Sequence, residues 1–380
     1  MIYLDHAATT PLHPTVLEAM LPYMQEHFGN PSSIHAYGQT VKLALGKARD
    51  TIARLLDCPA SAQLIFTSGG TESDNLAIFG VTSWDSQPER KHVITSAVEH
   101  HGVLHTCREL ERFGFEITVL PVDETGRIRI PDLESAIRSD TLMISLMFGN
   151  NEVGTLQPIE EAGRIARSRG VLFHVDAVQA LGMIPLQMAS LPIDLASFSA
   201  HKINGPKGMG ALYVAEGVKL APRLFGGSQE RNKRAGTENA AGIVGFAKAV
   251  ELALDNVPAK RDRMEFLRNR MIGALEATVG KDRFVVNGHP TEHLPHILNI
   301  SFPGTDTETL LMNLDLSGIA AASGSACSSG SLEPSHVLQA MELPEAVLRS
   351  AVRFSFGIFT TEREIDETVL AIATILRRYT

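Results

Sequence analysis

The stretch Phe173-His174-Val175-Asp176-Ala177-Val178-Gln179, followed downstream by Ser199-Ala200-His201-Lys202, carries the strongest signal for the fold of this chain. The first segment has the pattern of a buried strand that ends in a carboxylate, and the second places an amine directly after another apolar run. Similar apolar, β-branched runs alternate with helical patterns from about residue 63 to residue 214. Strands are predicted at residues 64–67, 92–96, 115–121, 142–148, 171–175, 195–199 and 210–214. This alternation predicts an α/β fold with a mainly parallel sheet covered by helices.

Polar residues follow most of these runs. They are Ser68-Gly69-Gly70-Thr71, Glu99-His100, Asn150-Asn151-Glu152, Asp176 and His201-Lys202. In open α/β sheets, ligands bind at the carboxyl ends of the strands. We therefore expect these polar residues to share one crevice.

The chain is long enough for more than one hydrophobic core. It has 380 residues, of which 44% are hydrophobic. Past residue 258, helices near residues 261–278 and strands near 297–302 and 352–356 predict a second unit. We predict a large domain at residues 12–257 and a smaller α+β C-terminal domain at residues 258–380, joined by residues 1–11.

Composition excludes several classes of function. The formal charge of −9 comes from scattered acids, and no basic stripe interleaved with aromatic residues suggests binding to nucleic acid. Neither an export signal nor an apolar run of membrane-spanning length is visible. Cys58, Cys107 and Cys327 are too few and too scattered for a disulfide framework. A cytoplasmic protein with small-molecule and protein partners is expected.

Lys202 and Asp176 together suggest a carbonyl cofactor. Pyridoxal phosphate needs a lysine for its Schiff base and an acid beside its ring nitrogen, which stays protonated and draws electrons from the substrate. Gln179, one turn further on, could donate to the phenolic oxygen of that cofactor. The alternatives are a solvated lysine, a helix cap or metal ligand at Asp176, and a turn cap at Gln179.

Two further motifs could complete such a site. Residues 67–73 leave a strand through glycines and enter a helix whose N-terminus could bind a phosphate, although Ser68 or Thr71 could equally be an ordinary helix cap. His100 could lie on a flat cofactor ring and exchange protons at neutral pH. The rival is a metal site, because His101 and His105 have the i, i+4 spacing of two ligands on one helical face.

Cys327 and Arg353 are candidates for substrate chemistry. Cys327 lies among serines and glycines, a composition typical of a mobile loop, so it could be a surface cysteine or a nucleophile that reaches a protein acceptor. Arg353 lies in the apolar run 352–356, where a buried guanidinium needs a carboxylate partner. That partner could be internal or the carboxylate of an amino-acid substrate.

These motifs resemble the cysteine desulfurases of the NifS/IscS type, in the class V aminotransferase group of fold-type I pyridoxal-phosphate enzymes. The resemblance covers almost the whole chain. It is carried by residues 3–10, 28–33, 67–75, 199–202, 234–239 and 323–327. The last segment resembles desulfurases with a long cysteine loop, whereas residues 228–230 and 234–239 are more similar to the NifS branch.

The resemblance implies a role for each matching residue. Lys202 would bind the cofactor and shuttle protons, Asp176 would hold the ring nitrogen and Gln179 would bond the phenolate oxygen. His100 would stack on the ring and assist proton transfer. The phosphate would be held by Gly70, Thr71, Ser199 and His201, with Thr237 supplied by the other subunit of a homodimer.

The resemblance also implies the reaction. Asn151 and Arg353 would hold the carboxylate of L-cysteine, and Cys327 would take its sulfur as a persulfide and release L-alanine. The sulfur would pass to an acceptor protein or an iron–sulfur scaffold. No metal site is implied, although an iron–sulfur cluster could bind transiently at Cys327.

Several alternatives stay open at this point. The nearest are selenocysteine lyase and an aminotransferase-like activity on the same fold, in which Cys327 would be dispensable. A non-catalytic scaffold for sulfur-transfer proteins and a metal-dependent hydrolase built on His101 and His105 are the others.

Overall fold

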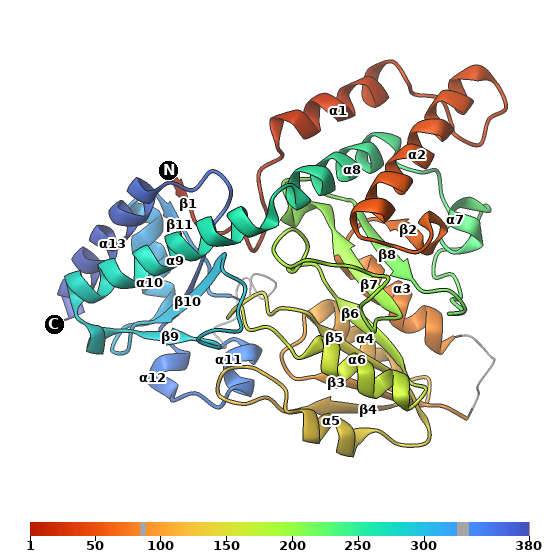
Figure 1. Ribbon diagram of the computed structural model, residues 1–380. Helices are drawn as coiled ribbons and strands as arrows, with labels where there is room; N and C mark the ends of the chain where they lie inside the picture. The colour runs from red at the N-terminus through yellow and green to blue at the C-terminus, as the bar shows by residue number, and fades with distance from the viewer. Residues whose placement is uncertain (84–88, 325–333, 380) are drawn as a thin grey trace.

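The computed structural model describes residues 1–83, 89–324 and 334–379. A seven-stranded sheet forms the centre of its larger part, in the order β2-β8-β7-β6-β5-β3-β4 (Figure 1). The strands are β2 (Leu64–Thr67), β3 (His92–Ser96), β4 (Glu116–Leu120), β5 (Thr141–Met147), β6 (Leu172–Asp176), β7 (Leu195–Ser199) and β8 (Gly210–Val214). The pairs from β4 to β7 are parallel, and β8 runs antiparallel to both β7 and β2. The predicted α/β fold with a mainly parallel sheet is confirmed.

Helices cover both faces of this sheet. The helices of this part are α1 (Pro14–Gln25), α2 (Ala36–Leu55), α3 (Gly70–Thr82), α4 (His101–Glu111), α5 (Ile130–Ala136), α6 (Ile159–Ser168), α7 (Gln229–Asn232) and α8 (Ala240–Leu254). One face packs against α3 and α4, and the opposite face packs against α2, α6 and α8. Because both faces are covered, β5 to β8 are buried at every or nearly every residue, as their apolar composition predicts.

A second core lies around a three-stranded antiparallel sheet in the order β12-β10-β9. Its elements are β9 (Val285–Asn287), β10 (Ile297–Ser301), β12 (Ala351–Ser355), α9 (Val257–Val279), α10 (Thr307–Leu316) and α13 (Glu362–Leu376). Helices α11 (His336–Ala340) and α12 (Glu345–Leu348) instead pack in a separate small cluster with Val98, Met147 and Val153 of the larger part. Helix α9 was predicted to start near residue 261, but it starts at Val257 with Pro258 in its first turn. Proline is tolerated there because the first N–H groups of a helix have no partner within it.

The N-terminal segment joins the two parts. Strand β1 (Ile2–Tyr3) pairs in parallel with β11 (Ile319–Ala320) beside the second core. A few residues later, Thr10 donates from its backbone N–H and its hydroxyl to the carbonyl of His201, at 3.0 and 2.7 Å. Residues 5–10 therefore pass directly beside the segment that carries Lys202.

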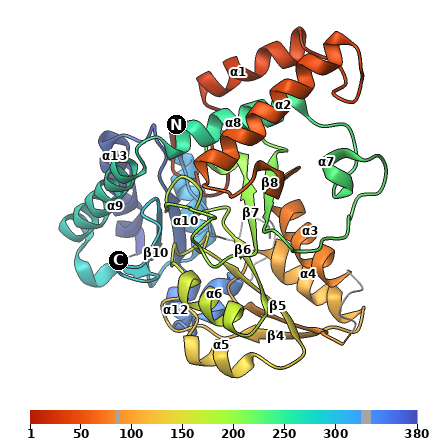
Figure 2. The same ribbon diagram turned by 45° about the vertical axis from the view of Figure 1, so that its right-hand side comes forward.

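Helices α1 and α2 project from the large part, together with the loop between them (Figures 1 and 2). Their exposed apolar side chains are Leu17, Leu21, Met24, Phe28, Ile34, Tyr37 and Leu43. Ile34 is 94% exposed and Leu43 is 74% exposed, which is unusual for such residues when several lie together. No helix in the described part of the chain is long and apolar enough to cross a membrane.

Candidate active site

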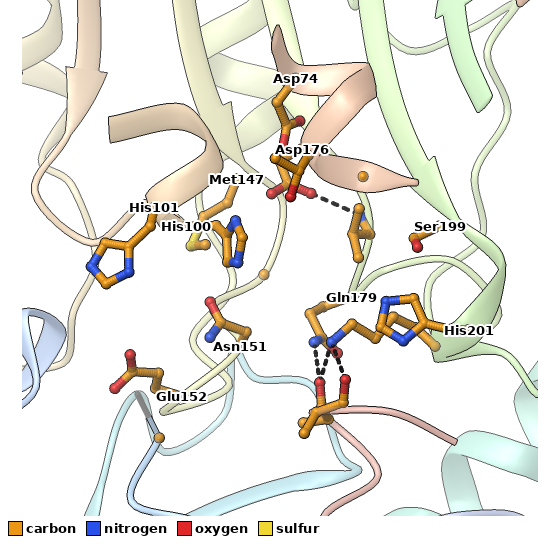
Figure 3. A pocket seen from close by; sticks show the side chains of 18 of the residues that line it. Asp74, His100, His101, Met147, Asn151, Glu152, Asp176, Gln179, Ser199 and His201 are labelled. Atoms are coloured by element: carbon orange, nitrogen blue, oxygen red, sulfur yellow. Dashed lines mark hydrogen bonds between the residues drawn. The ribbon is translucent and has the colours of Figure 1, made fainter. Parts of the chain in front are cut away.

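A cavity of about 270 Å³ lies beyond the carboxyl ends of β5, β6 and β7 (Figure 3). It is lined by ten of the residues predicted from the sequence, namely Gly70, Thr71, His100, Asn151, Asp176, Gln179, Ser199, His201, Lys202 and Arg353. Of the polar residues predicted to share one crevice, Ser68, Gly69, Glu99 and Asn150 do not line it, and the other eight do. These residues converge because parallel strands end at the same edge of the sheet.

One end of the cavity suits a phosphate. Helix α3 begins at Gly70, and its N-cap Gly69 makes no side-chain cap, so the alternative of a cap by Ser68 or Thr71 is wrong. The buried hydroxyl of Ser199 lines the same place and has no hydrogen-bond partner among the described residues. A Cβ added at Gly70 would lie 2.8 Å from Val178 Cγ2, so a larger residue at this turn would force Val178 to move. Free helix N–H groups and an unpaired buried hydroxyl fit the phosphate of a cofactor.

His100 stands at the N-terminus of α4. Its Nδ1 accepts the backbone N–H of Gly102 at 3.0 Å, which leaves the ring proton on Nε2. Burial and the nearby Lys202 charge lower the pKa of His100 to about 4. The imidazole is therefore neutral at pH 7, flat, and held in orientation by the helix it caps. It follows the end of β3 at Ser96 by four residues.

Asp176 is the last residue of β6 and points into the cavity (Figure 3). Its Oδ1 accepts the backbone N–H of Val178 at 2.9 Å. Burial raises the pKa of this carboxyl, while the Val178 bond and the charge of Lys202 act in the opposite direction. An acid in this position can hold a protonated ring nitrogen, which would add a further favourable charge.

Lys202 and Gln179 both reach the N-terminal segment. Lys202 Nζ donates to the carbonyls of Ala7 and Ala8 at 2.5 and 2.8 Å, and Gln179 Nε2 donates to the carbonyl of Ala7 at 3.0 Å (Figure 3). His201, next to Lys202, holds the same segment through Nδ1 and Thr9 Oγ1 at 3.1 Å. The segment thus forms one wall of the cavity and orients the amine.

Arg353 lies on β12 and is almost fully buried. Its Nη2 pairs with Asp5 Oδ1 at 2.7 Å, and its Nη1 donates to the carbonyls of Asn151 and Gly324 at 2.8 and 3.2 Å. Its Nε has no partner among the described residues. Arg353 therefore has the internal carboxylate that its burial requires, and it also lines the cavity with charge available to a substrate.

Two predicted residues lie elsewhere. Thr237 is exposed and does not line the cavity of its own chain. Its loop is tied to the start of α3 by an ion pair between Arg234 Nε and Glu72 Oε1 at 2.8 Å. Cys327 lies outside the described residues.

The histidines of the rival metal site do lie together. The rings of His101 and His105 stack with their centroids 4.9 Å apart. The ring centroid of His336 lies 4.6 Å from that of His101. Within residues 1–83, 89–324 and 334–379, however, no group of three or more histidine, cysteine or acidic side chains has an arrangement that could hold a metal ion.

The sequence analysis missed two acids of the site. Asp5 pairs with Arg353 across 348 positions of sequence, a contact that no local pattern could indicate. Asp74 lines the cavity with 1% of its surface exposed. Its position was readable, because it lies four residues after Gly70 and therefore on the same face of α3.

Comparison with known proteins identifies the family of this chain. The family model described as aminotransferase class-V matches residues 2–368. The chain belongs to this family of enzymes, which depend on pyridoxal phosphate. Within it, the chain belongs with the cysteine desulfurases of the NifS/IscS type.

The individual matches extend over nearly the whole chain. It is 47% identical to a cysteine desulfurase IscS of Dictyoglomus turgidum, over 99% of this chain and 95% of that protein. It is 48% identical to a cysteine desulfurase IscS of Methanosarcina thermophila, over 99% and 92%. Among solved structures, a NifS-like protein superposes with a TM-score of 0.92 at 36% identity, covering 99% of both chains. SspA in complex with cysteine superposes with a TM-score of 0.82 at 35% identity, over 95% and 100%.

Proposed function

We propose that this protein is a pyridoxal-phosphate-dependent cysteine desulfurase that transfers the sulfur of L-cysteine to Cys327. The observation that carries the proposal is the convergence of Lys202, Asp176 and His100 on one cavity that is also lined by Arg353 and by the first residues of α3. When bound, the cofactor supplies an electron sink that makes the Cα proton of cysteine acidic and its C–S bond breakable.

The residues of the chain divide the remaining work. Lys202 would hold the cofactor covalently and then move a proton at Cα. Asp176 would face the ring nitrogen and Gln179 the phenolate oxygen. His100, neutral and fixed by Gly102, would lie on the ring and can pass a proton through Nε2.

The ends of the cofactor and the substrate have their own partners. The phosphate would be held by Gly70, Thr71, Ser199 and His201, with Thr237 from a second subunit. Asn151 and Arg353 would bind the substrate carboxylate, since a guanidinium suits a planar carboxylate.

The sulfur step balances without a further reagent. The Cys327 thiolate would attack the sulfur of cofactor-bound cysteine, an S–S bond would form, and the C–S bond would break with its electron pair left on carbon. Protonation of that carbon gives alanine, so that L-cysteine and the Cys327 thiol become L-alanine and a Cys327 persulfide. An acceptor or iron–sulfur scaffold protein would then remove the sulfur.

A homodimer is part of this proposal. The exposed apolar side chains of α1, α2 and the loop between them, of which Ile34 and Leu43 are among the most exposed, form a surface that a second copy of the chain could cover. We also infer two domains, residues 12–257 and residues 258–380 with 1–11, each around its own core. A cytoplasmic location stays a prediction.

The decisive experiment measures alanine and sulfide released from L-cysteine in the presence of a reductant. Wild type, Lys202→Ala and Cys327→Ser are compared after loading with pyridoxal phosphate. We expect release by wild type alone, with Cys327→Ser still binding the cofactor. Turnover by Lys202→Ala, or persulfide on Cys58 or Cys107, would contradict the assigned roles. Selenocysteine and amino-acid/keto-acid pairs are assayed as alternative substrates, to test for selenocysteine lyase and aminotransferase activity.

Mixed dimers test the predicted contribution of Thr237. A Lys202→Ala subunit paired with a Thr237→Ala subunit retains one complete site only if Thr237 acts across the interface. Activity of the mixed dimer well above that of both parent homodimers is expected. A mixed dimer no more active than the average of its parents would place Thr237 outside the partner's site.

A further inference from the structure

Asp74 is a second buried carboxyl that lines the cavity. It projects from α3 one helical turn after Gly70, and it lies next to Asp176, as Figure 3 shows. Two carboxylates this close in a buried site do not both ionise readily, because each charge opposes the other. Hydrogen bonding decides which of them keeps the proton.

Asp176 has the better partners for a negative charge. It accepts the N–H of Val178 at 2.9 Å and interacts with the charge of Lys202. Asp74 Oδ1, in contrast, has no hydrogen-bond partner among the described residues. The Nε2 atom of His174 lies 3.7 Å from Asp74 Oδ1 and is within bonding distance of Ser197 Oγ instead, at 2.9 Å. A buried carboxylate is costly to ionise when one of its oxygens has no hydrogen-bond partner, so the proton belongs on Asp74.

The charges around Asp74 favour the same assignment. Within the described part of the chain, six titratable groups face it. They are Asp176 and His174 on β6, Glu99 after β3, His100 at the N-cap of α4, Cys107 within α4, and Lys202 across the cavity. Burial raises the pKa of Asp74 well above its usual value, the charge of Asp176 raises it further, and Ser197 opposes the shift.

The remaining groups add little negative charge near pH 7. Burial lowers the pKa of His174 to about 3 and raises the pKa of Glu99 to about 8. It also raises the pKa of Cys107 to about 12. His174 is therefore neutral, Glu99 is mostly protonated, and Cys107 is a thiol. Asp176 is left as the carboxyl that ionises.

We propose that Asp74 is a positioning residue that stays protonated in the resting enzyme, so that the cofactor's ring nitrogen faces one negative charge, held by Asp176. A second charge at Asp74 would share the ring proton between two acceptors and weaken the pairing with Asp176. A neutral Asp74 also fills the space behind Asp176 without drawing water into the site. This inference rests on the proposed role of Asp176.

The proton can be observed directly by infrared spectroscopy of the loaded enzyme. A protonated carboxylic acid has a carbonyl stretch that a carboxylate lacks, and labelling aspartate with carbon-13 separates its band from that of Glu99. We expect a label-sensitive band at pH 7 in wild type that disappears in Asp74→Asn. Asp282→Asn, an exposed aspartate of the small unit, is the matched control and should keep the band. Absence of the band in wild type, or its persistence in Asp74→Asn, would overturn the proposal.

Asp176→Asn provides the second measurement, and it does not require Asp74→Asn to fold. Removing the charge of Asp176 should let Asp74 lose its proton at a lower pH than in wild type, because the two groups titrate as a pair. An unchanged titration would show that the carboxyls do not share one charge. The pyridoxal-phosphate absorbance spectrum of the same variant tests Asp176 separately: an unaltered spectrum would refute its contact with the ring nitrogen, whatever the state of Asp74.

Discussion

Replacing Arg353 by alanine should weaken the binding of ligands that carry an α-carboxylate. In the structure, Arg353 pairs with Asp5 at 2.7 Å and donates to two carbonyls at 2.8 and 3.2 Å, so its guanidinium is held in place beside the cavity. A hydrogen bond to a charged group contributes roughly 1.5–3 kcal/mol. Arg353 could make two such bonds to a substrate carboxylate. Because Asp5 already neutralises part of its charge, we take the lower end of the range for each bond, which gives a total of about 3 kcal/mol. This corresponds to an affinity loss of about 150-fold.

The assay compares two ligands of the loaded enzyme by the change in cofactor absorbance. L-Alanine carries the carboxylate, whereas cysteamine has the amine and thiol of cysteine without it. Arg353→Ala should lose affinity for L-alanine and retain it for cysteamine. Arg353→Lys should lose an intermediate amount, because an ammonium keeps the charge but not the planar fork. Thermal unfolding serves as a control, and we expect a modest change, since the Asp5 side chain is 20% exposed and water can reach it. An unchanged affinity for L-alanine, or equal losses for both ligands, would refute the reasoning and leave Arg353 as a structural residue.

Three further predictions concern stability, the cofactor and pH. Glu230→Gln should lower the free energy of unfolding by about 3 kcal/mol in a denaturant titration. The substitution leaves Arg49 without its buried carboxylate partner, which it contacts through Nη2 and Glu230 Oε1 at 2.6 Å. A loss below about 0.5 kcal/mol would show that the ion pair contributes little to stability. Ser199→Ala should weaken pyridoxal-phosphate binding about tenfold in a cofactor titration, since it removes one hydroxyl donor to the phosphate, and equal affinity would assign the phosphate to other groups. Burial raises the pKa of Glu99 from 4.5 to about 8, so the native state binds this proton more tightly than the unfolded chain does. The contribution of Glu99 to stability therefore falls as the pH rises from about 4.5 to 8. Glu99→Gln should flatten that part of the stability profile by up to about 1.4 kcal/mol per pH unit, and an unaltered slope would contradict the raised pKa.

Much of the large sheet was predictable because its signals are local. The runs at residues 92–96 and 195–199 coincide with β3 and β7, since strands covered on both faces are rich in apolar residues, even though these two also bury histidine, threonine or serine. The start of α3 was less certain, because a glycine-rich turn with serine and threonine suits both an ordinary cap and a phosphate site. The unpaired hydroxyl of Ser199, on a strand 129 positions away from Gly70, favours the phosphate site.

The amino-acid sequence by itself determined the fold class, the family and ten residues of the cavity, because each depends on hydrophobic periodicity, on glycine and proline chemistry or on motifs that are continuous along the chain. Only the tertiary structure decided how the charges of the site are paired. Asp5 meets Arg353, the Ala7 and Ala8 carbonyls orient Lys202, and Asp74 stands behind Asp176 without a donor of its own at Oδ1. The state of an acid or a base depends on burial and on neighbours brought together by folding, and the order of residues along the chain contains neither.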